Sequence, residues 1–269
     1  MTILSWEELL EGKASNLIGS ESCAATIGVF DGVHRAHREL IGRIVEAGGR
    51  RSAVITFRQS PKAVFAPQHF PGYLYSLSQR LSCFEHLGVG LVCLIDFSAD
   101  FGKIGGKDFI SLIQDRLKLR YLAIGSNFRC GYGLDTDATR IAALNKALGI
   151  RTDIVPSVQK DGLPVSSSRI RTAMASGDLV EVRALLGRDI EIDLDGVPTT
   201  PGPDWLDYNV GAVRRLTPPP GRYAVTYLAE GFSPVRGFVD IQASCVRVYQ
   251  KDALRIRFDP SLRGADVFE

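Results

Sequence analysis

The feature that most limits the fold of this chain is a short apolar run, CAATIGVF at residues 23–30, which stops abruptly at Asp31 and Gly32. A run of this length without polar alternation is typical of a strand that is buried on both faces of a parallel sheet. Helical spacing of apolar residues follows between residues 34 and 47. The segment therefore predicts a strand, a tight turn and a helix, which together form the repeating unit of an α/β fold.

The same alternation continues along the chain. Further strands are expected at residues 53–57, 91–95, 121–125 and 151–155, and further helices at residues 78–87, 107–119 and 139–148. This order predicts an α/β fold with a Rossmann-like parallel sheet and helices on both of its faces. Ligands of such sheets bind beyond the carboxyl ends of the strands. The sequence therefore predicts a site near Asp31, Phe57 and Gly125.

The composition and the hydrophobic pattern of the sequence change after residue 188. Prolines crowd residues 198–220, and short alternating runs follow at residues 223–228, 237–241, 245–249 and 254–258. Short strands with frequent turns indicate a small all-β domain. We therefore expect two domains, residues 1–187 and residues 188–269.

Charge and composition argue against several classes of protein. Lys and Arg number 32 against 30 Asp and Glu, and the small net charge of +2 does not indicate a nucleic-acid binder. No apolar stretch reaches the length of a membrane span, so no membrane association is expected. The five cysteines include no Cys-x-x-Cys pair and are expected to be reduced thiols of a cytoplasmic protein. The oligomeric state stays open.

The sharpest local feature is the segment GVFDGVHRAH at residues 28–37. His34 and His37 open the expected helix, and their spacing of three places both on one face of its first turn. Free backbone N–H groups and the positive end of the helix dipole favour phosphate at this place, and two imidazoles can stabilise charge on a leaving pyrophosphate. Two alternatives remain: ordinary surface histidines, or a zinc site, for which His69 and His86 are the only other histidines.

Two further segments carry polar groups near expected strand or helix ends. GSNFRCGYG at residues 125–133 follows a strand and offers the amide of Asn127 and the charge of Arg129, although it also fits an ordinary glycine-rich loop. VSSSRIR at residues 165–171 offers hydroxyls and Arg171 for phosphate, although its serines also fit a helix N-cap.

Together these segments resemble the FMN adenylyltransferase domain of bacterial bifunctional riboflavin kinase/FAD synthetases. That family shows GxFDGVHxGH, TFxPxP, (D/N)FRFGxxRxGD and SSTxIR in this order. The corresponding residues here are 28–37, 56–61, 127–137 and 166–171, and FSADF at residues 97–101 resembles the stretch between the second and third motifs. The resemblance spans residues 20–187.

The resemblance implies transfer of AMP from ATP to FMN, with Mg²⁺ bridging phosphate oxygens and no metal ligands in the protein itself. The implied catalytic residues are His34, His37, Asn127 and Arg171. The implied ATP contacts are Gly28, Phe30, Asp31, Gly125, Ser167 and Ser168, and the implied flavin contacts are Phe57, Phe128 and Arg129. ATP and FMN are the expected small-molecule partners.

Several positions depart from the family pattern, namely Ala36, Gln59, Cys130, Leu134 and Thr136. They leave two alternatives open. One is a decayed paralogue that binds nucleotide or flavin in a regulatory role. The other is a nucleotidyltransferase with a different acceptor.

The tail resembles the riboflavin kinase barrel in PGRYAV at residues 220–225. The kinase motif GFPTAN corresponds to WLDYN at residues 205–209, where Asn209 is kept and Asp207 replaces the threonine. The segment ASCVRVY at residues 243–249 offers no glutamate in place of the kinase base. We therefore expect a degenerate barrel without riboflavin kinase activity. An alternative register through residues 197–200, VPTT, stays open.

Overall fold

The computed structural model describes residues 1–97, 101–243 and 245–263, so the middle of the FSADF stretch lies outside the described residues. The chain forms two compact units. The first comprises Met1–Phe70 and Leu81–Pro164, and the second comprises Pro71–Arg80 and Val165–Glu269.

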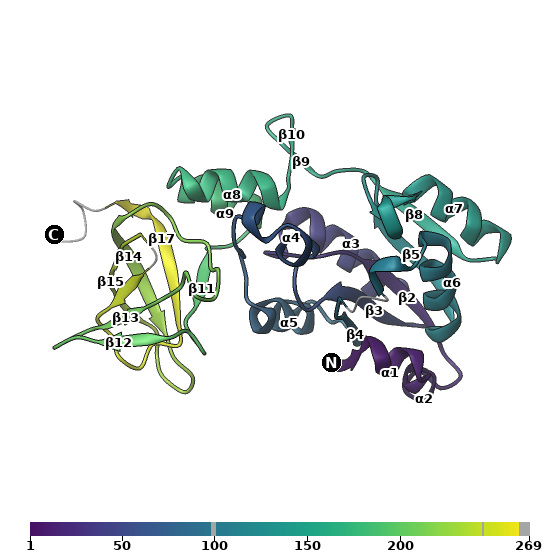
Figure 1. The fold of residues 1–269 in the computed structure, drawn as a ribbon, viewed down its shortest axis with the longest axis horizontal. Helices are drawn as coiled ribbons and strands as arrows, with labels where there is room; N and C mark the ends of the chain where they lie inside the picture. The colour runs from purple at the N-terminus through teal and green to yellow at the C-terminus, as the bar shows by residue number, and fades with distance from the viewer. Residues whose placement is uncertain (98–100, 244, 264–269) are drawn as a thin grey trace. The chain divides into compact units, whose positions relative to one another are not determined.

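The first unit is built on a six-stranded parallel sheet with the order β1-β4-β3-β2-β5-β8 (Figure 1). Its strands are β1 (Thr2–Ser5), β2 (Ser22–Ile27), β3 (Arg50–Phe57), β4 (Leu91–Ile95), β5 (Leu119–Gly125) and β8 (Arg151–Val155). Every residue of β4 and five of the six residues of β2 are buried, as expected for strands covered on both faces.

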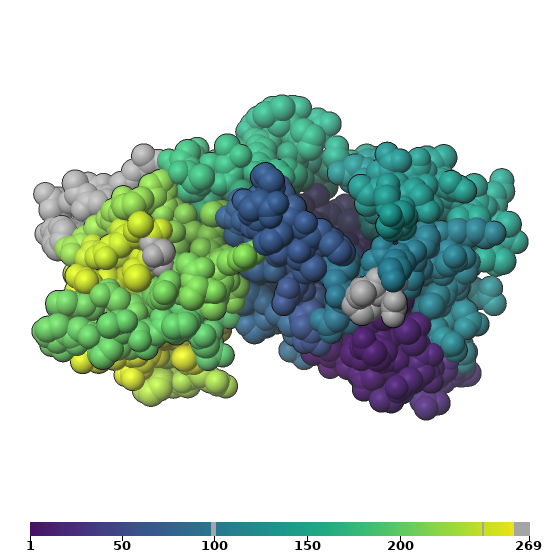
Figure 2. Space-filling model, in the orientation of Figure 1, coloured from purple at the N-terminus to yellow at the C-terminus, as the bar shows by residue number. Residues whose placement is uncertain are grey.

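Helices cover both faces of this sheet. They are α1 (Trp6–Leu10), α2 (Lys13–Ile18), α3 (Arg35–Val45), α4 (Pro61–Phe65), α5 (Leu77–His86), α6 (Gly106–Arg116) and α7 (Ala138–Ala147). Residues of α1, α2, α6 and α7 share one apolar core with the strands, whereas α3 packs on β2, β3 and β5. In the space-filling view α1 and α2, in purple, lie at the surface of this unit (Figure 2).

The predicted fold class is confirmed, and the two strands β4 and β8 have the predicted bounds. The edge strand β1 was not predicted. Its sequence, TILS, is short and only Leu4 is buried, so it carries too little apolar pattern to indicate a strand.

The second unit is built on a curled seven-stranded antiparallel sheet with the order β11-β17-β14-β15-β16-β13-β12. Its strands are β11 (Glu191–Asp193), β12 (Thr199–Pro201), β13 (Leu206–Tyr208), β14 (Gly221–Leu228), β15 (Val235–Ile241), β16 (Val246–Val248) and β17 (Arg255–Arg263). Two helices, α8 (Ser167–Ala175) and α9 (Leu179–Leu186), also belong to this unit. The curled sheet forms a half-barrel, which confirms the small, degenerate β-barrel that the resemblance implies.

Three small pairings complete the structure: β6 (Arg129–Cys130) with β7 (Thr136–Asp137), β9 (Gln159–Lys160) with β10 (Leu163–Pro164), and a single bridge between Tyr73 and Arg215. Within the described ranges, none of the helices has the length and apolar character needed to cross a bilayer.

Candidate active site

The order of the strands reverses between β2 and β5. From β2 the chain adds β3 and β4 on one side, and β5 and β8 lie on the other side. In open α/β sheets the crevice beyond the carboxyl ends at such a reversal is the usual place for a ligand. His34 follows β2 and Asn127 follows β5, so the predicted residues of the first unit belong to this end of the sheet.

A constrained turn connects β2 to α3. Phe30 and Val33 have positive φ values of 52° and 39°, which are rare for bulky and β-branched residues. The turn is tied to β3, because Gly28 N donates to Ile55 O at 3.1 Å and Thr56 Oγ1 donates to Val29 O at 3.2 Å. Backbone strain of this kind persists where the surroundings enforce it, and it is concentrated at functional sites.

The imidazole rings of His34 and His37 stack with centroids 3.6 Å apart and planes 16° apart. The ring of Phe30 meets His37 edge-on at 5.1 Å. His34 is buried and occupies the N-cap position of α3, but its imidazole makes no capping hydrogen bond with the helix. The two imidazoles therefore lie beside the free N–H groups in the first turn of an eleven-residue helix, and these donors together suit the binding of a phosphate group.

A tight turn at the end of β5 carries Asn127. Phe128 N donates to Gly125 O at 2.9 Å, and Ser126 N donates to Val155 O at 3.0 Å. The side-chain oxygen of Asn127 lies so near Gly125 that an added Cβ there would stand 3.2 Å from it. Asn127 is exposed, so its amide is accessible to a ligand.

The two phenylalanines predicted to contact flavin, Phe57 and Phe128, both pack against the core cluster of the first unit. Phe57 also stacks on Phe97, with ring centroids 4.9 Å and planes 4° apart. Arg129 is exposed and its Nε donates to Leu134 O at 3.3 Å within the β6–β7 hairpin. Phe97 was not among the predicted site residues, although its place in the FSADF stretch was the available signal.

The remaining predicted residues, Ser167, Ser168 and Arg171, lie on α8 in the second unit. The N-cap of α8 is Ser166, whose hydroxyl accepts from Arg169 N at 3.2 Å, so one serine of the VSSSRIR segment does cap the helix. Arg171 Nε donates to Gly72 O at 3.0 Å. That these three residues meet the histidines stays a prediction.

The zinc alternative finds no support in residues 1–97, 101–243 and 245–263, where His, Cys, Asp and Glu do not gather in groups of three that could hold a metal ion. Cys93 is buried in the core, and burial raises the pKa of its thiol to about 12. A thiol with this pKa stays protonated at neutral pH and is a poor nucleophile.

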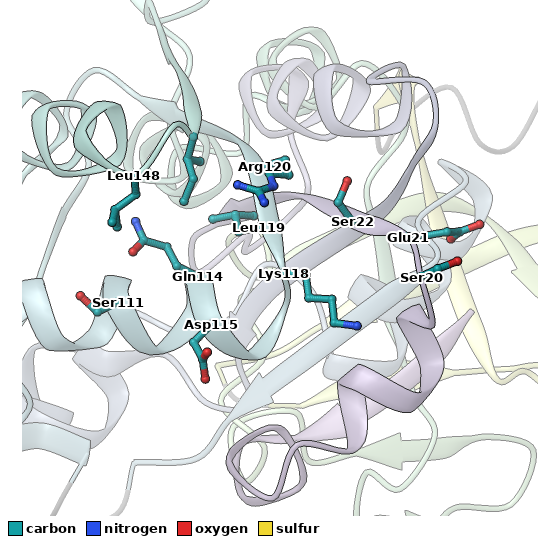
Figure 3. A pocket seen from close by; sticks show the side chains of 11 residues that line it. Ser20, Glu21, Ser22, Ser111, Gln114, Asp115, Lys118, Leu119, Arg120 and Leu148 are labelled. Atoms are coloured by element: carbon teal, nitrogen blue, oxygen red, sulfur yellow. The ribbon is translucent and has the colours of Figure 1, made fainter.

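A hollow of about 690 Å³ lies at the opposite ends of the strands, where β2 and β5 begin (Figure 3). Its lining mixes charges of both signs, Glu21 and Asp115 with Lys118 and Arg120. Because the amino ends of the strands are not where open α/β sheets bind ligands, this hollow does not belong to the candidate site.

In the second unit Asp207, which stands at the threonine of the kinase motif, is bound by Arg247. The guanidinium donates to both carboxylate oxygens at 2.9 and 3.0 Å and stacks over the ring of Trp205. The hydrogen bonds from Arg247 lower the pKa of Asp207. This pairing could not be predicted from the sequence, because the two residues are 40 apart and meet only through the register of β13 and β16.

Comparisons with known proteins show which family the chain belongs to. A family model described as FAD synthetase matches residues 18–169. The bifunctional riboflavin kinase/FMN adenylyltransferase of Escherichia coli is 30% identical over 236 residues, covering 82% of this chain and 73% of that protein. The corresponding protein of Bacillus subtilis is 31% identical over 210 residues, covering 74% of this chain and 65% of that protein.

A solved structure described as a macrolide-efflux protein from Streptococcus pneumoniae has a TM-score of 0.77 at 19% identity, covering 96% of this chain and 90% of that one. At this identity the likeness concerns the fold alone. The family model and the sequence relatives carry the assignment: the chain belongs to the FAD synthetase family and is an enzyme of the nucleotidyltransferase class.

Proposed function

We propose that this protein transfers AMP from ATP to FMN and lacks riboflavin kinase activity. A phosphate oxygen of FMN attacks the α-phosphorus of ATP, the bond from that phosphorus to the pyrophosphate oxygen breaks, and FAD and pyrophosphate leave. Nucleotidyl transfer of this kind needs positioning and charge stabilisation rather than a nucleophilic side chain.

The observation that carries the proposal is the stacked pair of His34 and His37 at the N-terminus of α3, beside the strand-order reversal. In the proposed mechanism these imidazoles and the amide of Asn127 donate hydrogen bonds to the triphosphate, and Arg171 stabilises the leaving pyrophosphate. The ATP contacts Gly28, Phe30, Asp31, Gly125, Ser167 and Ser168 belong to the same proposal.

Magnesium fits this donor set as an ion held mainly by substrate phosphates. Mg²⁺ usually takes one or two carboxylates and keeps several waters or phosphate oxygens, and Asp31 is a buried carboxylate in the turn before α3. When bound, the ion would lie near Asp31 and would neutralise the negative charge of the substrate phosphates.

The flavin side of the proposal rests on Phe57, Phe128 and Arg129. Phe57 and Phe128 are partly buried and anchored in the core, which suits rigid apolar walls for a flat ring system. Arg129 directly follows Phe128 in sequence and is exposed, and it supplies a partner for the FMN phosphate.

The absence of kinase activity is supported by the pair of Asp207 and Arg247. The kinase reaction needs a magnesium ligand at the threonine position of the motif, where this chain has Asp207, and a base to orient the riboflavin hydroxyl. A carboxylate that already holds a bidentate arginine is a poor magnesium ligand, because the ion would have to displace two charge-assisted hydrogen bonds. The proposal assigns adenylyl transfer to a domain of residues 1–187 and treats residues 188–269 as the kinase-like domain.

The test is to incubate the purified protein with ATP, magnesium and FMN and to quantify FAD and pyrophosphate by chromatography. Equal amounts of both support the proposal. Nucleotide or flavin binding without turnover favours the decayed paralogue instead, and pyrophosphate release only with another acceptor favours a different nucleotidyltransferase.

A further inference from the structure

The guanidinium of Arg171 is held by a main-chain group that is 99 residues away in sequence. Its Nε donates to the carbonyl oxygen of Gly72 at 3.0 Å, and both residues belong to the second unit. A guanidinium is a planar fork of five N–H donors. A hydrogen bond at Nε therefore sets the plane and the direction in which the donors at the end of the fork lie.

Gly72 is itself fixed by the turn at residues 214–216. Tyr73 N donates to Arg214 O at 2.8 Å, and Leu216 N donates to Tyr73 O at 3.0 Å. Gly72 has a φ of 109°, and an added Cβ would stand 3.0 Å from Arg214 O. Glycine is thus required by both the backbone conformation and the close approach, and the carbonyl has little freedom to move.

The other end of the segment that contains Gly72, residues 71–80, is hydrogen-bonded to β11. Asp193 is buried, and its Oδ2 accepts hydrogen bonds from Ser76 Oγ at 2.6 Å and Ser78 Oγ at 2.7 Å. Gln79 Nε2 donates to Glu191 O at 3.0 Å. A buried carboxylate is costly unless it is fully hydrogen-bonded, so these contacts hold the segment firmly against the sheet.

We propose that Gly72, anchored by residues 214–216 of the second unit, is a positioning residue that aims Arg171 for adenylyl transfer. The inference rests on the proposed function, because it takes the role of Arg171 from there. It gives the C-terminal half of the chain a task in FAD formation that does not require kinase chemistry.

The first test compares Gly72→Ala with Gly149→Ala. Gly149 also has a positive φ, 66°, but an added Cβ there meets nothing within 4 Å, so this control isolates backbone strain. Displacing a positioned group by about 1 Å can cost on the order of 10²-fold in rate. We expect Gly72→Ala to lower kcat for FAD formation about 10- to 10²-fold and to weaken product inhibition by pyrophosphate. The KM for FMN should stay the same, and Gly149→Ala should keep the wild-type kcat.

The second test is a double-mutant cycle with Arg171→Ala. If Gly72 acts through Arg171, adding Gly72→Ala to Arg171→Ala changes kcat by less than about twofold, the usual limit of error in such cycles. If the kcat of the double mutant falls by the product of the two single-mutant losses, the inference is overturned. Wild-type turnover of Arg171→Ala alone overturns the proposed role of Arg171 instead, so the two failures are distinguishable.

A third variant keeps the test valid if Gly72→Ala does not fold. Arg171→Lys keeps the positive charge, but lysine has no Nε–H group that could donate to Gly72 O and so fix the direction of the charged group. We expect it to lose kcat and pyrophosphate inhibition in the same direction as Gly72→Ala, with an unchanged thermal midpoint. Full wild-type activity of Arg171→Lys contradicts the proposal, because orientation would then be unimportant.

Discussion

The ring of Phe30 lies over Gly28 so closely that a β-carbon at Gly28 would stand 3.1 Å from the Cζ atom of Phe30. Phe30 is buried, and its positive φ of 52° folds the ring back over the end of β2. The same ring meets His37 edge-on. The glycine of the motif is therefore needed for the turn that brings the histidines into place.

Gly28→Ala tests this relationship. The added methyl must displace the Phe30 ring, and overpacking of this kind costs about 1–3 kcal/mol. We expect a lower free energy of unfolding in urea and weaker ATP binding in calorimetric titration. Gly42→Ala is the control, because Gly42 lies within α3 and an added Cβ there meets nothing within 4 Å. Wild-type ATP affinity in Gly28→Ala contradicts the account.

Ala36→Gly probes the departure from the family motif in the first turn of α3. Glycine allows close approach of a ligand to the backbone, so we expect ATP affinity to rise or to stay unchanged in a titration. The helix loses about 0.5–1 kcal/mol because glycine costs more entropy to order than alanine does. A clear loss of ATP affinity shows instead that the methyl group fits a reshaped pocket.

The pair of Asp207 and Arg247 predicts the result of a kinase assay. Riboflavin with ATP and magnesium yields no FMN above the level of a reaction without enzyme. Thr199, in the alternative register, lies on the exposed strand β12 opposite Tyr208. FMN accumulation that Thr199→Ala abolishes means that the kinase motif lies at residues 197–200.

The pH dependence of stability is set in part by Asp240. Arg222 donates to both of its carboxylate oxygens at 2.7 and 2.8 Å, which lowers the pKa of Asp240, and Tyr249 OH adds a bond of 2.6 Å. A carboxyl group with a lowered pKa stabilises the folded state above its unfolded pKa of about 3.9, and this contribution is lost as the pH falls through the folded pKa.

We therefore expect the difference in thermal midpoint between wild type and Asp240→Asn to be constant at neutral pH and to shrink as the pH falls below about 4. Because both proteins contain the same other carboxylates, taking the difference between their thermal midpoints cancels the effect of those groups' titration. A difference that stays constant down to about pH 2 contradicts the expected coupling.

Most of the central strands and the longer helices of the first unit were predictable because their apolar runs are dense, whereas the short elements β1, α1, α2 and α4 were not predicted. The helical spacing of His34 and His37 likewise indicated that both rings share a face, and the rings do stack. The role of the pair remains a prediction, since geometry alone does not establish catalysis.

Other relationships could not be predicted because they depend on pairing across long sequence separations. Arg247 reaches Asp207 only through strand register, and Gly72 reaches Arg171 from a loop without periodicity. Phe97 stacks on Phe57 because β3 and β4 end side by side, which a single sequence does not reveal.

The most direct test of the central claim is the rate of FAD formation from ATP and FMN by His34→Ala and His37→Ala. His69→Ala serves as the control, because His69 is an exposed residue outside the motif. Loss of one preorganised electrostatic donor typically costs on the order of 10²–10³ in rate. We predict losses of this order in both variants with an unchanged thermal midpoint and wild-type rates in the control. Wild-type turnover in either variant would show that the paired imidazoles do not hold the transferring phosphates.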